Sequence, residues 1–452
     1  MSLINEVLAK NVGLTILEKT KNPEVRKIFK IYLDSITWSK DEIENYQVSK
    51  IKQLLEYAYK NTKFYRKRFD ESNFNYIKFN NLDQLKKIPI LTRYDLQKFS
   101  NDILSQEKDK FIISKGSSSG STGEPITYYH DQYTNSAHKA AVLLAKYLVG
   151  YKLGDPWINI WGNPTAVNVD WKKLSSKISK KLFNESRFPA YQLNEEKQLF
   201  NLLKMIENKR PKYIYGYTNA IYIFSKFLEK NNSPQNNIKG VFTTAENLHE
   251  YQRHVIERML GKVYDNYGCS EINGIAAQTS YSEFYSVIEP NVYMEFAELQ
   301  PGSDLQKIIV TDLHNKVFPL IRYENGDLGA PLLQDSDSEL HYSEIKSIDG
   351  RVSDIITLPE GGHLVVPSFF GSRMLKNISG IKQYQIVQDT YDHIKINLVI
   401  DQGFEEKDKS VIKETLESYL PQSLKYDLVF NRPIVLSNNG KFKLYINEIL
   451  HN

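Results

Sequence analysis

Residues 211–271, PKYIYGYTNAIYIFSKFLEKNNSPQNNIKGVFTTAENLHEYQRHVIERMLGKVYDNYGCSE, alternate short β-branched and aromatic runs with longer helical ones. The runs PKYIYGY, GVFTTAE and KVYDNYG predict strands. The stretches at 220–228 and 249–260 predict the helices between them. Because alternating strands and helices are typical of layered α/β architecture, this segment predicts the fold class.

The same alternation extends upstream to about residue 111. FIIS at 111–114 predicts a strand, and a Gly/Ser-rich loop follows it. The next runs predict a helix, AAVLLAKYLV at 140–149, and a further strand, WINIWG at 157–162. We therefore expect the α/β layering to begin with this strand and loop.

The first 110 residues have a different pattern. Apolar side chains recur there at helical spacing and predict a helical N-terminal extension, for instance at Ile51, Leu54, Leu55 and Ala58. The basic run from Lys60 to Arg68 could suggest RNA binding, but a solvated helix face is the better interpretation.

Beyond residue 285 the chain becomes mostly β. Four runs in succession predict strands: YSVIEP, VYMEFAEL, QKIIVTDL and PLIRYENGDLG. After Arg351, strand and helix patterns alternate again, over a length sufficient for a small domain with its own core. We predict a large layered α/β body with a β-rich closing segment, residues 1–350, and a small α+β domain, residues 351–452.

Length, composition and charge exclude several classes of protein. The 452 residues are 41% hydrophobic and 25% charged, which excludes a single small module and a disordered chain. The net charge of +4 is too small for non-specific binding to nucleic acid or to an anionic membrane. The only cysteine, Cys269, permits neither an intrachain disulfide nor a thiolate cage around a metal.

No targeting or membrane segment is evident. The first residues lack the basic-then-apolar order of a secretory signal. The longest apolar stretch, 137–154, is interrupted by Lys139, Lys146 and Lys152, which argues against a bilayer span. We expect a cytoplasmic protein without nucleic-acid partners or stable membrane insertion. The sequence leaves a homodimer open.

The Gly/Ser-rich loop KGSSSGSTGEP, Lys115 to Pro125, has the composition of an anion-binding loop. Glycines let backbone N–H groups approach an anion, and the hydroxyls add donors. The loop lacks the lysine of a Walker A motif, and it contains no G-x-G-x-x-G. Taken alone, it is explained equally well by a plain flexible turn.

Five segments that follow one another along the chain favour the anion-binding interpretation of this loop over a plain turn. SSSGSTGEP resembles the phosphate loop of the adenylate-forming superfamily, and NYGCSE at 266–271 is similar to its Y-G-x-T-E motif. IRYENGDLG at 321–329 resembles its R-Y-x-x-G-D segment. DGRVSDII at 349–356 and NNGKFK at 438–443 are similar to its G-R-x-x-D-x-I segment and its C-terminal G-K element.

Two further stretches point to one branch of that superfamily. PKYIYGYTNA at 211–220 and LLEYAYKNTKFYRKRF at 54–69 resemble the branch of phenylacetate–CoA ligase, coenzyme F390 synthetase and capsule-biosynthesis CapK-type proteins. The resemblance implies a large N-terminal body and a mobile C-terminal domain that swings about residues 350–354 between two half-reactions. Ser353 stands where most relatives have aspartate or lysine, which leaves the behaviour of that hinge open.

The resemblance also implies a nucleotide site. It assigns the β- and γ-phosphates of ATP to the phosphate loop, namely to Ser118, Ser119, Gly120, Ser121, Thr122 and Gly123. It assigns Mg²⁺ to Glu271, a role that suits a carboxylate. It makes Asp327 the ribose ligand, since a carboxylate can accept hydrogen bonds from both hydroxyls. The remaining ATP-binding residues it implies are Glu246, Tyr267, Gly268 and Ser270.

Two cations complete the implied catalytic set with Glu271. Lys441 matches the lysine after glycine in the last motif and would stabilise charge between the substrate carboxylate and the α-phosphate. Lys443 is its nearest competitor. Arg351 would add a nearby fixed charge. In the absence of the other motifs, Lys441 would be interpreted as an ordinary surface lysine.

Several residues near the motifs keep two interpretations. Tyr213, Tyr215 and Tyr217 alternate at strand spacing and line either an acyl pocket or a half-buried structural strand. Cys269 could be a nucleophile, but a packing role is favoured. The histidines show no metal spacing, and we assign helix-face, loop and packing roles to His249, His254, His314 and His363.

The function that these residues and the resemblance imply is ligation. A carboxylic acid and ATP would give acyl-AMP and pyrophosphate, and the acyl group would pass to coenzyme A. An alternative keeps adenylation but delivers the activated group to an amine, sugar or cofactor, as in polysaccharide biosynthesis. A second alternative is a degenerate, non-catalytic nucleotide-binding protein. Retention of Glu271, Asp327, Arg351 and Lys441 argues against it.

Overall fold

The computed structural model describes most of the chain. The described residues are 12–13, 15, 18, 22–118, 126–162, 181–193, 195–300, 303–332, 338–351, 355–359, 363–366, 370, 378, 380–400, 402–431, 434 and 444–449. The predicted phosphate loop from 119 to 125, the hinge residues 352–354 and the C-terminal lysines Lys441 and Lys443 lie outside these ranges. Their expected roles stay predictions.

The N-terminal region is helical, as predicted. Its helices are α3 Val25–Asp34, α4 Lys40–Asn61, α5 Lys63–Glu71 and α6 Arg93–Ile103, with short 3-10 helices at Ser35–Thr37, Tyr76–Lys78, Leu82–Lys87 and Lys108–Lys110. Ser39 starts α4 with a capping box, and the helix buries the predicted apolar positions Ile51, Leu54, Leu55 and Ala58. The basic run is solvated as expected, with ion pairs from Lys60 to Glu56 and from Lys67 to Glu71.

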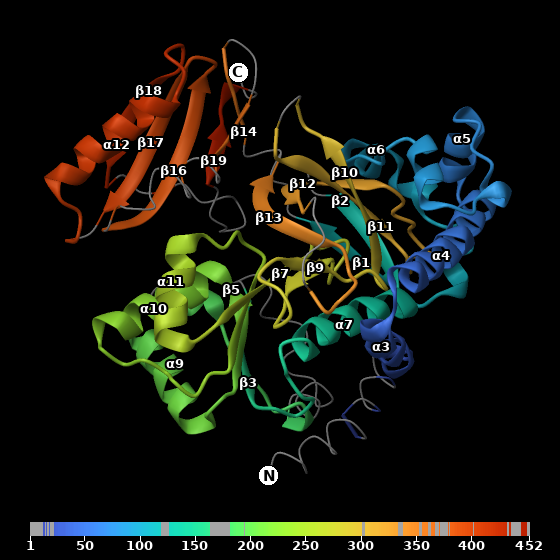
Figure 1. The fold of residues 1–452 in the computed structure, drawn as a ribbon, viewed down its shortest axis with the longest axis horizontal. Helices are drawn as coiled ribbons and strands as arrows, with labels where there is room; N and C mark the ends of the chain where they lie inside the picture. The colour runs from blue at the N-terminus through green and yellow to red at the C-terminus, as the bar shows by residue number, and fades with distance from the viewer. Residues whose placement is uncertain are drawn as a thin grey trace.

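Five parallel strands form one half of the main sheet. They are β3 Trp157–Ile160, β4 Glu185–Phe188, β5 Tyr213–Tyr217, β6 Gly240–Thr244 and β7 Val263–Tyr267. They lie in the order β4-β3-β5-β6-β7. Helices α9 Glu196–Lys209, α10 Thr218–Lys230 and α11 Glu250–Leu260 lie beside them (Figure 1). The alternation predicted for residues 211–271 is confirmed.

The two faces of this parallel half differ in chemistry. One face carries aliphatic side chains such as Ile158, Ile214 and Val241, which pack against buried residues of α9, α10 and α11. The opposite face carries rings, including those of Trp157, Tyr213 and Phe242. Because side chains alternate along a strand, each β-strand contributes to both faces.

The β-rich segment continues the same sheet. Its strands are β8 Ala276–Gln278, β9 Tyr285–Val287, β10 Val292–Glu298, β11 Gln306–Asp312, β12 Tyr323–Pro331 and β13 Glu344–Arg351. They extend from β7 in the order β8-β9-β13-β12-β11-β10, and the whole sheet has eleven strands among the described residues. Neighbouring strands in this half are antiparallel. The four predicted strands are present, whereas β8 and β13 were not predicted.

The flanks of the phosphate loop differ from the expectation. The loop was expected to join a strand to a helix. Instead, β1 Ile113–Ser118 and β2 Ile126–Asp131 pair antiparallel on its two sides, with Ser118 opposite Ile126. Helix α7 Gln132–Tyr147 begins only after β2, where the Asp131 side chain accepts from the Thr134 amide. The run ITYYHD was missed because its threonine, tyrosines and histidine do not form a simple apolar pattern.

The C-terminal region has its own sheet and core. A short pair, β14 Ile355–Thr357 and β15 His363–Val365, precedes β16 Ile381–Thr390, β17 His393–Ile400, α12 Glu406–Tyr419, β18 Lys425–Phe430 and β19 Tyr445–Asn447. The last four strands form one sheet in the order β18-β17-β16-β19. Ile394, Ile396 and Leu416 belong to one buried cluster there, and Figure 1 shows this sheet and α12 apart from the main sheet. The boundary at 350 stays a prediction.

In the described part of the chain, no helix combines the length and the apolar character that a bilayer span needs.

Candidate active site

The turn at 268–275 connects β7 to β8, at the point where the sheet changes from parallel to antiparallel pairing. The turn is tightly packed. A Cβ added to Gly268 would lie 3.1 Å from the amide nitrogen of Gly274. Gly274 has φ of +69°, and a Cβ added there would lie 2.6 Å from Cβ of Ala141 in α7. Gly274 is therefore required by both space and backbone conformation, whereas Gly268 is favoured by lack of space alone.

Glu271 lies in this turn and is buried. Its Oε1 lies 3.7 Å from a terminal guanidinium nitrogen of Arg93, the first residue of α6. The hydroxyl of Tyr323 in β12 donates to the same oxygen over 3.4 Å. The carboxylate is therefore held between a cation and a hydroxyl supplied by distant parts of the chain.

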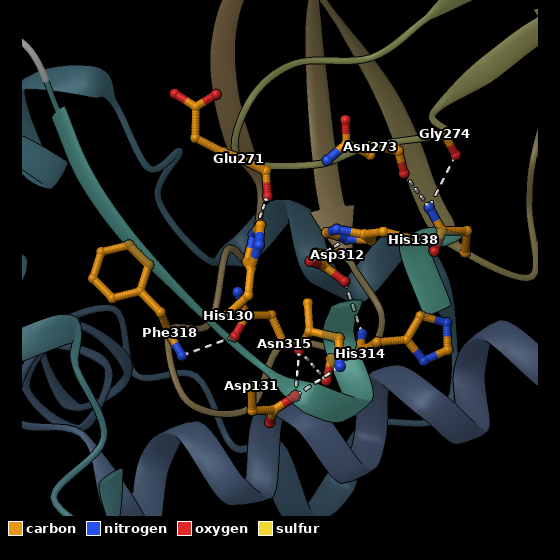
Figure 2. Close-up of polar contacts among 12 residues, drawn as sticks. His130, Asp131, His138, Glu271, Asn273, Gly274, Asp312, His314, Asn315 and Phe318 are labelled. Atoms are coloured by element: carbon orange, nitrogen blue, oxygen red, sulfur yellow. Dashed lines mark hydrogen bonds and ion pairs between the residues drawn. The ribbon is translucent and has the colours of Figure 1, made fainter. Parts of the chain in front are cut away.

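His130 in β2 supports Glu271 from the other side. Its Nε2 lies 2.7 Å from the backbone oxygen of Glu271, and the Glu271 carboxylate points away from this ring (Figure 2). Burial, and then the neighbouring His138, lower the pKa of His130 to about 4. The ring is therefore neutral at pH 7, and because a carbonyl oxygen can only accept, Nε2 carries the proton.

Tyr267 and Asp327, both predicted ATP-binding residues, are in direct contact. The Tyr267 hydroxyl donates to Oδ2 of Asp327 over 2.9 Å and accepts from Nδ2 of Asn325 over 2.7 Å. Burial, and then the charge of Asp327, raise the pKa of Tyr267 well above its usual value, so the phenol stays protonated. Asn325 also accepts from the Asp327 amide over 3.0 Å, which fixes this part of β12.

Arg351 lies beside this pair in the sheet. In the antiparallel pairing of β12 and β13, Arg351 is the Cα partner of Asp327. The structure describes the backbone of Arg351 and not its side chain. The motif segments IRYENGDLG and DGRVSDII, which the resemblance assigns to one nucleotide site, are thus adjacent at Asp327 and Arg351.

Glu246 follows β6 and interacts with the start of α10. Its Oε2 accepts from the Asn219 amide over 2.8 Å, and its backbone oxygen accepts from Oγ1 of Thr218 over 3.1 Å. A carboxylate at a helix N-terminus is favoured by the exposed N–H groups there. The preceding residue, Ala245, has φ of +69°, a conformation that favours glycine.

The remaining predicted nucleotide ligands are only partly described. Ser270 is exposed in the same turn as Glu271. Ser118 ends β1, and its backbone alone is described. Ser119, Gly120, Ser121, Thr122, Gly123 and Lys441 lie outside the described residues. Within the described ranges, Tyr267, Gly268, Ser270 and Glu271 come together in or next to one turn.

Cys269 is a packing residue, as favoured. It contacts the main hydrophobic core, and burial followed by the charges of Glu271 and Asp327 raises the pKa of its thiol well above the usual value. A thiol in this state is a poor nucleophile at neutral pH.

His249, His254 and His314 lie where structural roles are expected, whereas only the backbone of His363, in β15, is described. His249 immediately precedes α11, and burial lowers its pKa to about 4. His254 is exposed on α11, whereas Nε2 of His314 lies 2.8 Å from the Tyr32 hydroxyl. Across the described ranges, no three His, Cys, Asp or Glu side chains gather as a metal site would require.

Tyr213 and Tyr215 both pack in the aromatic face, which supports the structural interpretation, whereas the acyl-pocket role stays a prediction. Tyr213 is buried there. Tyr215 and Tyr217 are half-buried, and the ring of Trp161 lies 5.8 Å and 4.3 Å from their centroids. This patch, Trp161 with Tyr215 and Tyr217, lies at the carboxyl ends of β3 and β5. Trp161 was not singled out from the sequence.

The sequence did not indicate Arg93, His130, Tyr323 or Asn325 as site residues. Arg93 and His130 come from the helical extension and from an unpredicted strand. Tyr323 and Asn325 lie inside the quoted segment IRYENGDLG, so their nearness to Asp327 was the available signal.

Comparison with known proteins places these features in a family context. A family model described as the CapK C-terminal domain matches residues 359–448. The phenylacetate–coenzyme A ligase of Escherichia coli (strain K12) is 26% identical over 387 residues, which cover 80% of this chain and 83% of that protein. The enzyme of the same name from Pseudomonas putida is 23% identical over 364 residues, which cover 77% and 79%.

Solved structures share the fold. 2-Hydroxyisobutyryl-CoA ligase in the postadenylation state with 2-HIB-AMP has a TM-score of 0.70 at 17% identity, covering 91% of each chain. The same ligase with 2-HIB-AMP and CoA in its thioesterification state has a TM-score of 0.60 at 16% identity, covering 92% of each. The amide bond synthetase McbA from Marinactinospora thermotolerans has a TM-score of 0.51 at 15% identity, covering 71% of this chain and 66% of that one.

These comparisons confirm two expectations from the sequence. The resemblance to the adenylate-forming superfamily, in its phenylacetate–CoA ligase and CapK-like branch, is confirmed. The mixed α/β body with a separate C-terminal α/β region is also confirmed as the fold of such ligases.

Proposed function

We propose that this protein adenylates a carboxylic acid with ATP, releases pyrophosphate, and transfers the acyl group to coenzyme A. The observation that carries the proposal is the contact between Tyr267 and Asp327, next to Glu271 and opposite Arg351 in the sheet. Three of the five motif segments, those of Tyr267 and Glu271, of Asp327 and of Arg351, meet there. The curated relatives, which are named phenylacetate–coenzyme A ligases, support the same reaction class.

Adenylation requires that crowded negative charge be neutralised. An oxygen of the substrate carboxylate attacks the α-phosphorus, and the bond from that phosphorus to the pyrophosphate oxygen breaks. Asp327 would accept hydrogen bonds from the two ribose hydroxyls, while the Tyr267 hydroxyl fixes the orientation of its carboxylate. Arg351 and Lys441 would supply the cations next to the reacting phosphate.

Glu271 suits a Mg²⁺ ion in this scheme. Mg²⁺ is commonly held by one or two carboxylates together with substrate phosphates and water. Glu271 offers one hard oxygen donor whose position is already fixed by Arg93 and Tyr323. When bound, the ion would neutralise charge on the phosphate oxygens.

The identity of the acceptor is the finer part of the proposal. The relatives named phenylacetate–coenzyme A ligase, which match over 77% and 80% of this chain, favour coenzyme A. The CapK C-terminal match at 359–448 keeps the alternative open, in which an amine, sugar or cofactor accepts the activated group without coenzyme A. The C-terminal domain, from residue 351, would swing so that Lys441 serves the first half-reaction and the acceptor enters for the second.

The test is ATP–pyrophosphate exchange with a panel of carboxylic acids. Exchange reports the first half-reaction whatever the acceptor is, so at least one acid should support it. Product formation is then measured with and without coenzyme A. Turnover that is unaffected by coenzyme A would reject transfer to the thiol and favour the second acceptor class. An absence of exchange with every acid, from a folded protein, would reject adenylation.

A further inference from the structure

Two buried side chains hold the backbone of the Glu271 turn. The Nε2–H of His130 donates to the Glu271 carbonyl over 2.7 Å. Nδ2 of Asn291 donates to the carbonyls of Asn273 and Gly274 over 3.0 and 2.9 Å. Three carbonyls of one short turn are therefore bound by donors from outside it.

The two donors are themselves fixed by a buried polar network. Oδ1 of Asn291 accepts from the Tyr32 hydroxyl over 3.2 Å, and the same hydroxyl lies 2.8 Å from Nε2 of His314. Each of these three side chains is buried. Since a rotated Asn291 amide would break bonds at both of its ends, its donor geometry has little freedom.

His130 is fixed by a second branch of the network. Its ring lies edge-on to that of His138, with centroids 5.0 Å apart. Nε2 of His138 lies 3.1 Å from Oδ2 of Asp312, and Oδ1 of Asp312 accepts from the His314 amide over 2.9 Å. Figure 2 shows these residues beneath the turn, with the Glu271 carboxylate directed away from them.

The turn needs such support because few bonds within it fix its shape. Inside it, the Cys269 amide donates to the Ile272 carbonyl over 2.9 Å. At its ends, the Ile275 amide donates to the Tyr267 carbonyl over 3.0 Å. These bonds close the turn but do not touch the Glu271 carbonyl, which lies at the base of the catalytic side chain.

We propose that His130 and Asn291 are positioning residues that set the direction of the Glu271 carboxylate by holding the backbone of its turn. This inference rests on the proposed function, in which Glu271 binds the metal of the nucleotide. Groups that orient a metal ligand commonly contribute 10–100-fold to metal affinity or activity. Neither residue is required to touch the substrate.

Three substitutions at one position separate donor loss from loss of packing. The amide nitrogen of glutamine reaches the place of Nε2, so His130→Gln keeps the donor. The shorter side chain in His130→Asn places its amide near Nδ1, and His130→Leu has no donor. Tyr65→Phe is the matched control, because Tyr65 is a buried donor to the Pro319 carbonyl and both hydrogen-bond partners of its hydroxyl, Pro319 and Ile321, lie outside the turn.

Two measurements are made on each folded variant. The first is amide hydrogen exchange across 268–275, which needs no substrate. The second is the Mg²⁺ and ATP dependence of pyrophosphate exchange. We expect His130→Leu and His130→Asn to exchange faster in the turn and to lose about 10–100-fold in kcat/KM, with a raised half-saturating Mg²⁺ concentration. His130→Gln should recover most of both properties, and Tyr65→Phe should resemble the wild type.

The outcomes distinguish this inference from the proposed function. If the wild type supports no pyrophosphate exchange, the proposed function fails, and the hydrogen-exchange comparison still decides whether the turn is held. Unchanged hydrogen exchange in His130→Asn would overturn the inference. Equal losses in His130→Gln and His130→Asn would also overturn it, because the donor would then be irrelevant. If His130→Leu does not fold, the asparagine and glutamine pair decides.

Discussion

The hydroxyl of Tyr267 lies 2.9 Å from Oδ2 of Asp327 and donates a hydrogen bond to it. The bond joins the last residue of a parallel strand, β7, to an antiparallel strand, β12. Three strands, β8, β9 and β13, lie between these two in the sheet. A side-chain contact across that span indicates that the site is formed by the twist and curvature of the sheet together with its end turns.

Asp327→Asn should weaken ATP binding selectively at the ribose. Replacing charge-assisted hydrogen bonds by neutral ones should raise KM for ATP by roughly 10–100-fold, on the scale of about 1.5–3 kcal/mol for bonds to a charged group. The wild type should prefer ATP over 2′-deoxy-ATP in pyrophosphate exchange, and the variant should lose this preference. Tyr267→Phe, which keeps the carboxylate, should show a smaller loss. An unchanged preference in Asp327→Asn would exclude the ribose role.

Lys441→Ala should reduce the adenylation rate by roughly 10²–10³, the usual scale for removing one electrostatic stabiliser of a transition state. Binding of ATP should change much less, because this cation acts mainly on charge that develops during the reaction. Single-turnover pyrophosphate release measures the effect. Lys443→Ala is the matched control, and a larger loss in that variant would transfer the role to Lys443.

Ala245→Gly should leave stability unchanged or raise it by up to about 1 kcal/mol. The left-handed backbone at Ala245 costs about 1–2 kcal/mol for a residue with a Cβ, whereas glycine gains freedom in the unfolded chain. Ala297→Gly, in strand β10, should instead lose about 0.5–1 kcal/mol. Urea denaturation measures both. If Ala245→Gly lost more stability than the Ala297→Gly control, the backbone strain inferred at Ala245 would be contradicted.

Lys146 should make folding stability depend on pH. Its Nζ lies 3.7 Å and 4.6 Å from the ring centroids of Trp157 and Tyr215, in the buried aromatic face. Burial, and then Lys139, lower its pKa from 10.5 to about 7. The unfolded chain therefore binds more protons at this residue between pH 7 and 10.5, so the stability contribution rises with pH in that window.

Lys146→Met should be more stable than the wild type at pH 7. The difference in free energy of unfolding between the variant and the wild type should narrow by about 1 kcal/mol per pH unit up to pH 9. The reason is that the wild-type amine loses its proton at a lower pH in the folded chain than in the unfolded chain. Urea denaturation at pH 7, 8 and 9 measures the gap. Lys60→Met, at an exposed lysine, should show a gap that does not change over this range. A stability difference between Lys146→Met and the wild type that stayed constant over this pH range would contradict the lowered pKa of Lys146.

Local periodicity predicted much of the fold. The helical spacing of Ile51, Leu54 and Ala58 and the strands in 211–271 follow from side chains within a few residues of each other, so sequence patterns carry them. β2, β4, β8, β13 and β19 were missed because they are short or polar and are stabilised by their partners. The strands after residue 285 extend the main sheet by pairing with segments that are distant in the sequence. Spacing along the chain does not encode such pairing.

The residues of the candidate site likewise fall into a group that the sequence could predict and a group that it could not. Motif residues Tyr267, Glu271 and Asp327 could be named in advance because the quoted segments carry them. Arg93 and His130 could not, since their partner Glu271 is far along the chain and contact depends on how α6 and β2 pack on the turn. A supporting residue of this kind has no local signature, because any buried donor of suitable length could serve.

The reversal of strand direction at 268–275 limits how this protein can be divided. A fragment that stopped at Tyr267 would keep the five parallel strands but leave β7 with an unpaired row of backbone groups along its edge, a template for aggregation. A fragment that began at β8 would lack the neighbour on which its first strand depends. We therefore expect the two halves of the large sheet to fold only when they are expressed together, whereas the C-terminal sheet has its own buried core.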